Sequence, residues 1–165
     1  MKHIVFAFLV LTASASALSL EKGKSFPDLA LKSLDGKPTT AAKAISSNKL
    51  TLVEFWASWC SVCKKSFPYL NDISKKYADQ GFSVIGINTD DDTSDLSEVH
   101  DFLKDAPASF PILYGDTPAI YEKTGINGVP SAALVDQNGK VLAYYQSMRK
   151  KEKKQLEKDL ATYLK

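Results

Sequence analysis

The sequence predicts an α/β sandwich in which helices flank a mixed central β-sheet. Short apolar runs rich in β-branched and aromatic residues, typical of buried strands, alternate with segments whose apolar residues recur at helical spacing. Near the end of the chain, two apolar runs flank Asn138-Gly139, a strong signal for an antiparallel hairpin, and an amphipathic helix follows. Alternating strands and helices favour a sheet covered by helices, and the hairpin adds antiparallel strands, so the sheet is expected to be mixed.

The first residues have the pattern of a secretory signal peptide. Lys2 gives a positive start, Ile4–Leu11 is an apolar core, and small residues suit cleavage after Ala17 or, alternatively, after Ala15. The apolar core is too short to span a bilayer, which needs roughly 20 residues. We therefore expect a signal peptide over residues 1–17 and one domain over residues 18–165. The expected location is periplasmic or otherwise extracytoplasmic, without stable membrane insertion.

The N-terminal part of the domain leads into a central strand. Phe26–Thr40 is expected to be a hairpin or an extended lead-in, because Asp35-Gly36 is a turn signal between two short runs. Residues 41–49 are polar and predict a short helix or a loop. Thr51–Trp56 has the apolar, β-branched and aromatic character of a buried strand.

The later elements follow from hydrophobic spacing. Apolar residues recur at helical intervals from Cys60 to Tyr77, and Gly81 ends this unit. The same reasoning predicts a strand at 82–88, a helix at 94–105, a strand at 110–114, a helix at 119–124, a hairpin of 132–136 with 141–145, and a helix at 150–165. For the hairpin, Asn138-Gly139 predicts a type I′ turn.

Polar features of these elements have ordinary interpretations. Asp90–Asp95 is expected to be the solvated start of a helix, because it lacks the glycine and terminal glutamate of an EF-hand calcium loop. His100 lies off the apolar stripe and is expected to be exposed, without a metal or catalytic role. The lysines of the last helix are expected to be its solvated face.

The charge balance gives no reason to expect a nucleic-acid partner. The chain has 21 Lys and Arg against 19 Asp and Glu, a formal net charge of +2. A nucleic-acid-binding domain would instead carry a strong basic field.

Cys60 and Cys63 are the protein's only cysteines, and they stand where the central strand is followed by a helix. Unpaired backbone N–H groups and the dipole at a helix start stabilise an anion, so a thiol there ionises more readily. A thiolate attacks disulfides, and a second thiol at this spacing can resolve the mixed disulfide by closing a ring with the first. We assign Cys60, nearer the helix start and the solvent edge, as the nucleophile and Cys63 as the resolving thiol.

Structural roles for this pair are weaker interpretations. A permanent disulfide across so short a loop constrains little of the unfolded chain. A structural zinc site needs four ligands, whereas the chain without its leader offers two cysteines and His100. Export places the pair where disulfides persist. We therefore expect redox chemistry, with no metal and no cofactor beyond the redox-active Cys60–Cys63 disulfide.

Three motifs resemble the thioredoxin superfamily: WASWCSVC after an apolar strand, Pro68 within the next helix, and Gly128-Val129-Pro130-Ser131 before the last hairpin. The lead-in hairpin, the extra unit at residues 90–114 and the signal peptide are similar to the TlpA/ResA-like exported thiol–disulfide oxidoreductases. The resemblance covers nearly all of residues 24–165. It implies the thioredoxin fold with an N-terminal hairpin and an extra central insertion.

The resemblance also implies where a substrate binds. Pro130 matches the family's cis-proline, which faces the active cysteines and leaves the backbone of Val129 free to pair with a bound polypeptide. Trp59 matches the aromatic lid beside Cys60, whereas Trp56 is expected to pack in the core.

One acid and two departures from the family pattern bear on the chemistry. Glu54 stands where thioredoxins carry a buried acid, which would have a raised pKa and accept the Cys63 proton directly or through water. Strand alternation could instead turn Glu54 outward. Ser61-Val62 replaces the Gly-Pro of thioredoxin, which leaves the direction of electron flow open. Ser66 replaces a glutamate that ResA-like proteins often carry, which weakens the case for haem maturation.

Together these features predict an enzyme that reduces disulfides in other exported proteins, with apocytochrome c as one candidate substrate. Its electrons would come from a membrane thiol donor. An oxidase that introduces disulfides is one alternative. A Cu(I)-binding chaperone is another, since soft thiolates suit Cu(I), and a non-catalytic peptide-binding module is a third.

Overall fold

The residues that the structure describes form a mixed β-sheet, as the sequence predicts. The computed structural model describes residues 20–91 and 95–165, so the signal peptide predicted over residues 1–17 lies outside them. The strands are β1 (Ala30–Ser33), β2 (Pro38–Thr40), β3 (Leu50–Trp56), β4 (Phe82–Asn88), β5 (Ile112–Gly115), β6 (Ser131–Asp136) and β7 (Val141–Tyr145). They form a seven-stranded sheet in the order β2-β1-β5-β4-β3-β6-β7. β4 pairs in parallel with both β3 and β5, and the remaining pairs are antiparallel.

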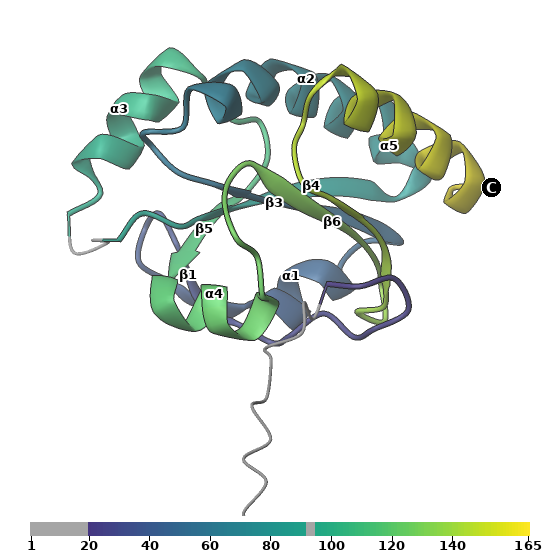
Figure 1. Ribbon diagram of the computed structural model, residues 1–165, viewed down its shortest axis with the longest axis horizontal. Helices are drawn as coiled ribbons and strands as arrows, with labels where there is room; N and C mark the ends of the chain where they lie inside the picture. The colour runs from purple at the N-terminus through teal and green to yellow at the C-terminus, as the bar shows by residue number, and fades with distance from the viewer. Residues whose placement is uncertain (1–19, 92–94) are drawn as a thin grey trace, which may run out of the picture.

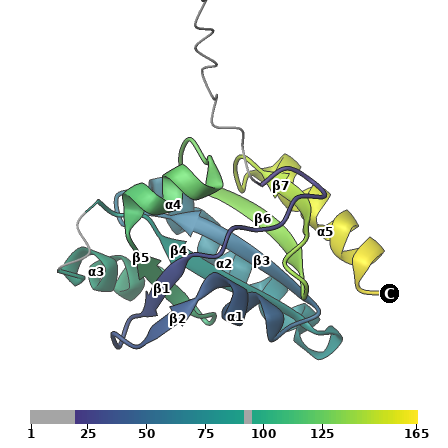
Figure 2. The same cartoon turned by 90° about the horizontal axis from the view of Figure 1, so that it is seen from below.

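Helices cover both faces of this sheet. One face carries α1 (Ala41–Ser46) and α4 (Thr117–Thr124), and the other carries α2 (Ser61–Tyr77), α3 (Ser97–Asp105) and α5 (Lys150–Tyr163) (Figures 1 and 2). A short 3₁₀ turn, η1 (Ala78–Gln80), joins α2 to β4. Across residues 20–91 and 95–165, no helix has both the length and the apolar character needed to cross a membrane.

β3 is an interior strand, between β4 and β6, and its side chains divide between two cores. All seven of its residues are buried. Leu52 and Trp56 pack in the core beneath α2 and α5, whereas Val53 and Phe55 pack in the core on the opposite face. Side chains alternate along a strand, so Glu54 lies on the same side as Leu52 and Trp56.

The N-terminal hairpin and the central insertion both have their expected places. β1 and β2 form the hairpin, and β1 also pairs with β5. α3 and β5 form the insertion between β4 and α4.

Before β1, residues 20–29 form a strap that begins beside β7 and crosses the α1 and α4 face (Figure 2). Gly23 and Phe26 donate backbone hydrogen bonds to Val141 (2.8 Å) and Gly139 (2.7 Å), respectively. Val141 in turn donates to the carbonyl of Lys24 at 2.9 Å.

The type I′ turn predicted for the last hairpin is wrong. That turn requires positive φ at both central residues, but among the described residues only glycines have positive φ, including Gly139 at 80°. Gly139 donates to the carbonyl of Asp136, and the Asp136 carboxylate accepts from the amides of Asn138 and Lys140, each at 2.9 Å. The connection is therefore a four-residue loop over residues 137–140, in which Gly139 has a left-handed conformation. The Asp136 carboxylate stabilises this loop by accepting hydrogen bonds from two of its backbone amides.

Candidate active site

Cys60 and Cys63 form a disulfide at the start of α2, with an S–S distance of 2.02 Å and a Cα–Cα distance of 5.3 Å. Cys60 caps the helix, because its Sγ accepts a hydrogen bond from the amide of Cys63 at 3.1 Å. The predicted junction between strand and helix is therefore confirmed. Cys60 is 5% exposed and Cys63 is fully buried, so Cys60 is the more accessible of the two residues.

The loop that leads into α2 is held by Asp90. The amide of Ser58 donates to Asp90 Oδ1 at 2.9 Å, and Asn88 Nδ2 donates to Asp90 Oδ2 at 3.1 Å. Asp90 is only 6% exposed, so its assignment to a solvated helix start is wrong. The helix begins later, at Ser97. The physical reason is that β3 and β4 are parallel neighbours, so the residues after each strand meet at one edge of the sheet.

Asp90, which positions the active-site loop, was not predicted as a site residue from the sequence. The signal was present, because Asp90 follows the strand that pairs with β3. His100 is exposed, as predicted. No group of three or more metal-ligating side chains lies together in the part of the chain that the structure describes.

Glu54 is fully buried, and the alternative in which it turns outward is wrong. Neither of its carboxylate oxygens has a hydrogen-bond partner among the described residues. Burial raises the pKa of Glu54 from 4.5 to about 8, and the nearby Ser66 hydroxyl and the positive charge of Lys153 oppose that rise with smaller effects. The Ser66 hydroxyl donates to the carbonyl of Cys63 at 2.8 Å. Ser66 therefore lies between the acid and the helical turn that carries Cys63.

Pro130 lies at the same edge of the sheet as the cysteines. The Val129–Pro130 bond is cis, as the resemblance implies. β6 runs antiparallel to β3 with Ser131 opposite Phe55, so Pro130 is level with the end of β3 that leads to Cys60. Pro130 is buried, and Val129 is partly buried.

The two tryptophans lie in opposite environments. Trp59, next to Cys60 in the chain, is 68% exposed, which is unusual for a large hydrophobic side chain. Trp56 is fully buried in an aromatic cluster, with its ring 5.1 Å from Phe67 and 4.6 Å from Phe102 between centroids. The predicted core position of Trp56 is confirmed, and the exposure of Trp59 leaves its indole free to contact a partner.

Comparisons with known proteins point to one chemistry. Residues 21–160 match the Redoxin family. The chain is 30% identical over 133 residues to the thiol-disulfide oxidoreductase ResA of Bacillus thuringiensis subsp. konkukian, covering 81% of this chain and 74% of that protein. It is 28% identical over 145 residues to the thioredoxin-like protein YneN of Bacillus subtilis, covering 87% and 83%, respectively.

The fold leads to the same group of proteins. A crystal structure from Chlorobium tepidum, proposed to be the thiol:disulfide interchange protein DsbE, superposes with a TM-score of 0.76 at 34% identity. The match covers 89% of this chain and 100% of that one. With its CxxC disulfide at the start of α2, the chain therefore belongs to the redoxin family of the thioredoxin superfamily, and it is a TlpA/ResA-like thiol–disulfide oxidoreductase.

Proposed function

We propose that this enzyme is exported after cleavage of residues 1–17 and reduces disulfides in other exported proteins. One observation supports this most: a CxxC disulfide lies at a helix start, close to a buried acid without a hydrogen-bond partner. The helix start stabilises the Cys60 thiolate, and the acid provides a site for a proton. The enzyme needs no metal or cofactor besides the two cysteines.

In the first step, the Cys60 thiolate of the reduced enzyme attacks one sulfur of a substrate disulfide. The substrate S–S bond breaks, an enzyme–substrate mixed disulfide forms, and one substrate thiolate leaves. Cys60 takes this role because it is the more exposed of the two cysteines. Its Sγ also accepts a hydrogen bond from the backbone amide of Cys63, which stabilises a thiolate.

In the second step, Cys63 resolves the mixed disulfide. Its thiol gives a proton to the Glu54 carboxylate, directly or through water, and the resulting thiolate attacks Cys60 Sγ. The Cys60–Cys63 disulfide forms and the second substrate thiolate leaves, so the substrate gains the two electrons that the enzyme loses. Because the pKa of Glu54 is about 8, only the ionised minority of Glu54 can accept this proton near pH 7, and that carboxylate is close to a thiolate in basicity.

The substrate strand would lie beside Pro130. The backbone of Val129 would pair with the substrate, and the exposed indole of Trp59 would cover its apolar part. A membrane thiol donor would then return two electrons to the Cys60–Cys63 disulfide. Apocytochrome c is one candidate substrate among exported proteins with closely spaced cysteines.

The direction of electron flow is tested by the reduction potential of the Cys60–Cys63 pair, measured in dithiothreitol buffers through tryptophan fluorescence. We expect a value of about −270 mV or lower, as in thioredoxin. A value near about −120 mV would overturn the reductase proposal and favour an oxidase. Cu(I) binding without reduction of insulin would favour the copper chaperone.

The roles of the two sulfurs are tested by trapping. Cys63→Ser should accumulate a mixed disulfide at Cys60 with a disulfide-bonded substrate, whereas Cys60→Ser should form none, and intact mass measurement distinguishes the two. Glu54→Gln should accumulate the same adduct transiently, because the resolving step has lost its proton acceptor. Trapping by Cys60→Ser but not by Cys63→Ser would reverse the assignment, and equal trapping by both variants would contradict it.

A further inference from the structure

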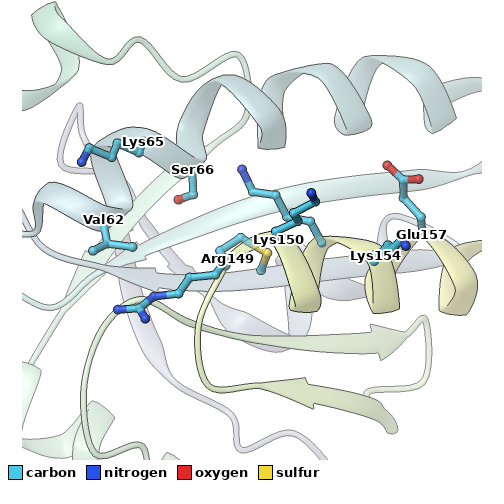
Figure 3. A pocket seen from close by; sticks show the side chains of 9 residues that line it. Val62, Lys65, Ser66, Arg149, Lys150, Lys154 and Glu157 are labelled. Atoms are coloured by element: carbon cyan, nitrogen blue, oxygen red, sulfur yellow. The ribbon is translucent and has the colours of Figure 1, made fainter.

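A groove lies between α2 and α5, beside the active cysteines. It has a volume of about 620 Å³, within the range of natural ligand sites. Val62, Lys65 and Ser66 contribute from α2, at the i, i+3 and i+4 positions that share one face of a helix. Figure 3 shows these side chains across the groove from those of α5 and the residue before it. The lining residues from that side are Met148, Arg149, Lys150, Lys153, Lys154 and Glu157.

The two helices that form the groove are fixed against each other. Tyr69 on α2 donates its hydroxyl hydrogen bond to the carbonyl of Lys153 at 3.2 Å. Lys153 Nζ lies 4.4 Å from the centroid of the Tyr69 ring, a cation–π contact. Leu156 and Leu160 of α5 are fully buried against the sheet. The groove is therefore preformed, so a ligand does not have to order it.

The groove concentrates positive charge. Its lining contains five cations, Lys65, Arg149, Lys150, Lys153 and Lys154, and one carboxylate, Glu157. None of the five forms an ion pair within 4.0 Å among residues 20–91 and 95–165. The whole chain is nearly neutral, so this density is local.

Acidic residues gather on the other flank of α2. Asp91, Asp95, Glu98, Asp101 and Asp105 line the surface around Trp59 and α3, and Lys104 and Lys64 form ion pairs with Asp101 and Asp105, respectively. Figure 1 shows α3 and α5 on opposite sides of α2, so the N-terminal end of α2 lies between surfaces of opposite charge. A protein that approaches Cys60 is therefore oriented by two fields of opposite sign.

We propose that the groove between α2 and α5 binds a carboxylate-rich segment of the disulfide-bearing protein with which Cys60 reacts. This inference rests on the proposed function. Val62 lines the groove and lies between the two cysteines in the sequence, so a bound segment lies against the turn of α2 that carries them. Val62 supplies an apolar contact for the stem of a chain, whereas Met148, only 2% exposed, forms the floor of the groove. A concave site between two helices admits a polypeptide segment, whereas the surface of a bilayer is too broad to enter it.

The test compares two peptides that contain the same intramolecular disulfide. One carries four Glu residues beside it and the other four Gln residues, with the flank placed on either side of the disulfide. Reduced enzyme is mixed with each peptide, and the second-order rate of enzyme oxidation is followed by tryptophan fluorescence. At low salt, about 20 mM, we expect the acidic peptide to react at least about tenfold faster. The difference should largely vanish at about 500 mM salt, because the charges are then screened.

Two charge-reversal variants locate the effect. Lys150→Glu with Lys154→Glu should bring the ratio of acidic to neutral rates to one or below. The first of these substitutions places an acid at the start of α5, which the helix dipole favours. The matched control, Lys32→Glu with Lys43→Glu, makes the same charge change at exposed residues of β1 and α1 and should keep the ratio. An equal loss of the ratio in the control, or an original ratio near one, would overturn the proposal.

Failure of the groove and failure of the proposed function give different results. If neither disulfide peptide oxidises the reduced enzyme, the reductase proposal fails. The groove is then still tested by fluorescence anisotropy with a labelled Glu-rich peptide that contains no cysteine. Binding that only the groove variant abolishes supports the inference. Absence of peptide binding, or binding only to vesicles that contain phosphatidylglycerol, overturns it.

Discussion

Glu54 is a carboxylate that the fold buries without a hydrogen-bond partner, and this makes stability depend on pH. The unfolded chain loses the Glu54 proton near pH 4.5, whereas the folded protein keeps it until about pH 8. Unfolding therefore releases a proton between these values, so the free energy of unfolding falls as pH rises through this window. The full contribution is at most about 5 kcal/mol.

Glu54→Gln removes this titration. We expect the wild-type oxidised protein to lose stability between about pH 5 and about pH 8.5 by several kcal/mol more than the variant does, in urea unfolding. Because other groups titrate in both proteins, the difference between the two pH profiles is the quantity that tests the prediction. Parallel profiles would mean that the acid ionises at a similar pH in the folded and unfolded states.

Asp90 gives a second prediction for a single residue. Asp90→Ala leaves the part-buried backbone amide of Ser58 and the buried side-chain amide of Asn88 without an acceptor, and each such loss costs about 1–3 kcal/mol. We expect lower stability and a slower reaction of Cys60, because the loop before α2 is no longer held. Asp90→Asn keeps an acceptor oxygen and should recover part of both properties. An alanine variant with wild-type reaction rates would show that the loop keeps its position without Asp90.

At the level of elements, Gly86 allows the aromatic cluster of the core to pack against the sheet. A Cβ at this position would lie 2.8 Å from Ile112 Cδ1 and 3.1 Å from Trp56 Nε1, so the core would have to shift. Gly86→Ala should lower the free energy of unfolding by about 1–3 kcal/mol. Gly128→Ala is the control, because nothing lies within 4 Å of its Cβ and its φ is not positive. It should change stability by less than about 0.5 kcal/mol, and equal effects would contradict the packing argument.

Hydrophobic spacing predicts most elements of this fold, because side chains that face a core repeat with the period of the helix or strand. The strand expected at residues 82–88 has those bounds in the structure. Contacts between elements cannot be predicted from hydrophobic spacing. The hydrogen bond that the Ser58 amide donates to Asp90 joins residues 32 positions apart and depends on which strands are neighbours. For the same reason, spacing shows the polar faces of α2 and α5 but not the groove between them.

The direction of Glu54 also could not be predicted from alternation. In a sheet with one solvated face, a charged residue marks the exposed side, but both faces of β3 are covered. The turn after Asp136 was missed because the Asn-Gly signal describes only the loop's central residues. The Asp136 carboxylate accepts hydrogen bonds from the backbone amides of Asn138 and Lys140, and these bonds stabilise the longer loop.

At the scale of the whole molecule, the strap ties the two ends of the sheet together. Leu20, Phe26 and Leu29 of the strap are all buried in the core beneath α1 and α4. A chain that begins at Asp28 loses the first two of these side chains, each worth about 1.5–3 kcal/mol, together with the hydrogen bonds to β7. We expect it to be less stable than a chain that begins at Leu18 by about 3–6 kcal/mol in urea unfolding. Equal midpoints would show that the strap contributes little.

The strap also sets the order in which the molecule can be completed. Its partners, Gly139 and Val141, are far along the chain, so residues 20–29 have no sheet edge to pair with until the last hairpin exists. During synthesis, residues 20–29 leave the ribosome first but can form these hydrogen bonds only after residues 139–141 have been made. Closure of the strap onto β7 is therefore a late contact, which forms only when nearly the whole domain is present.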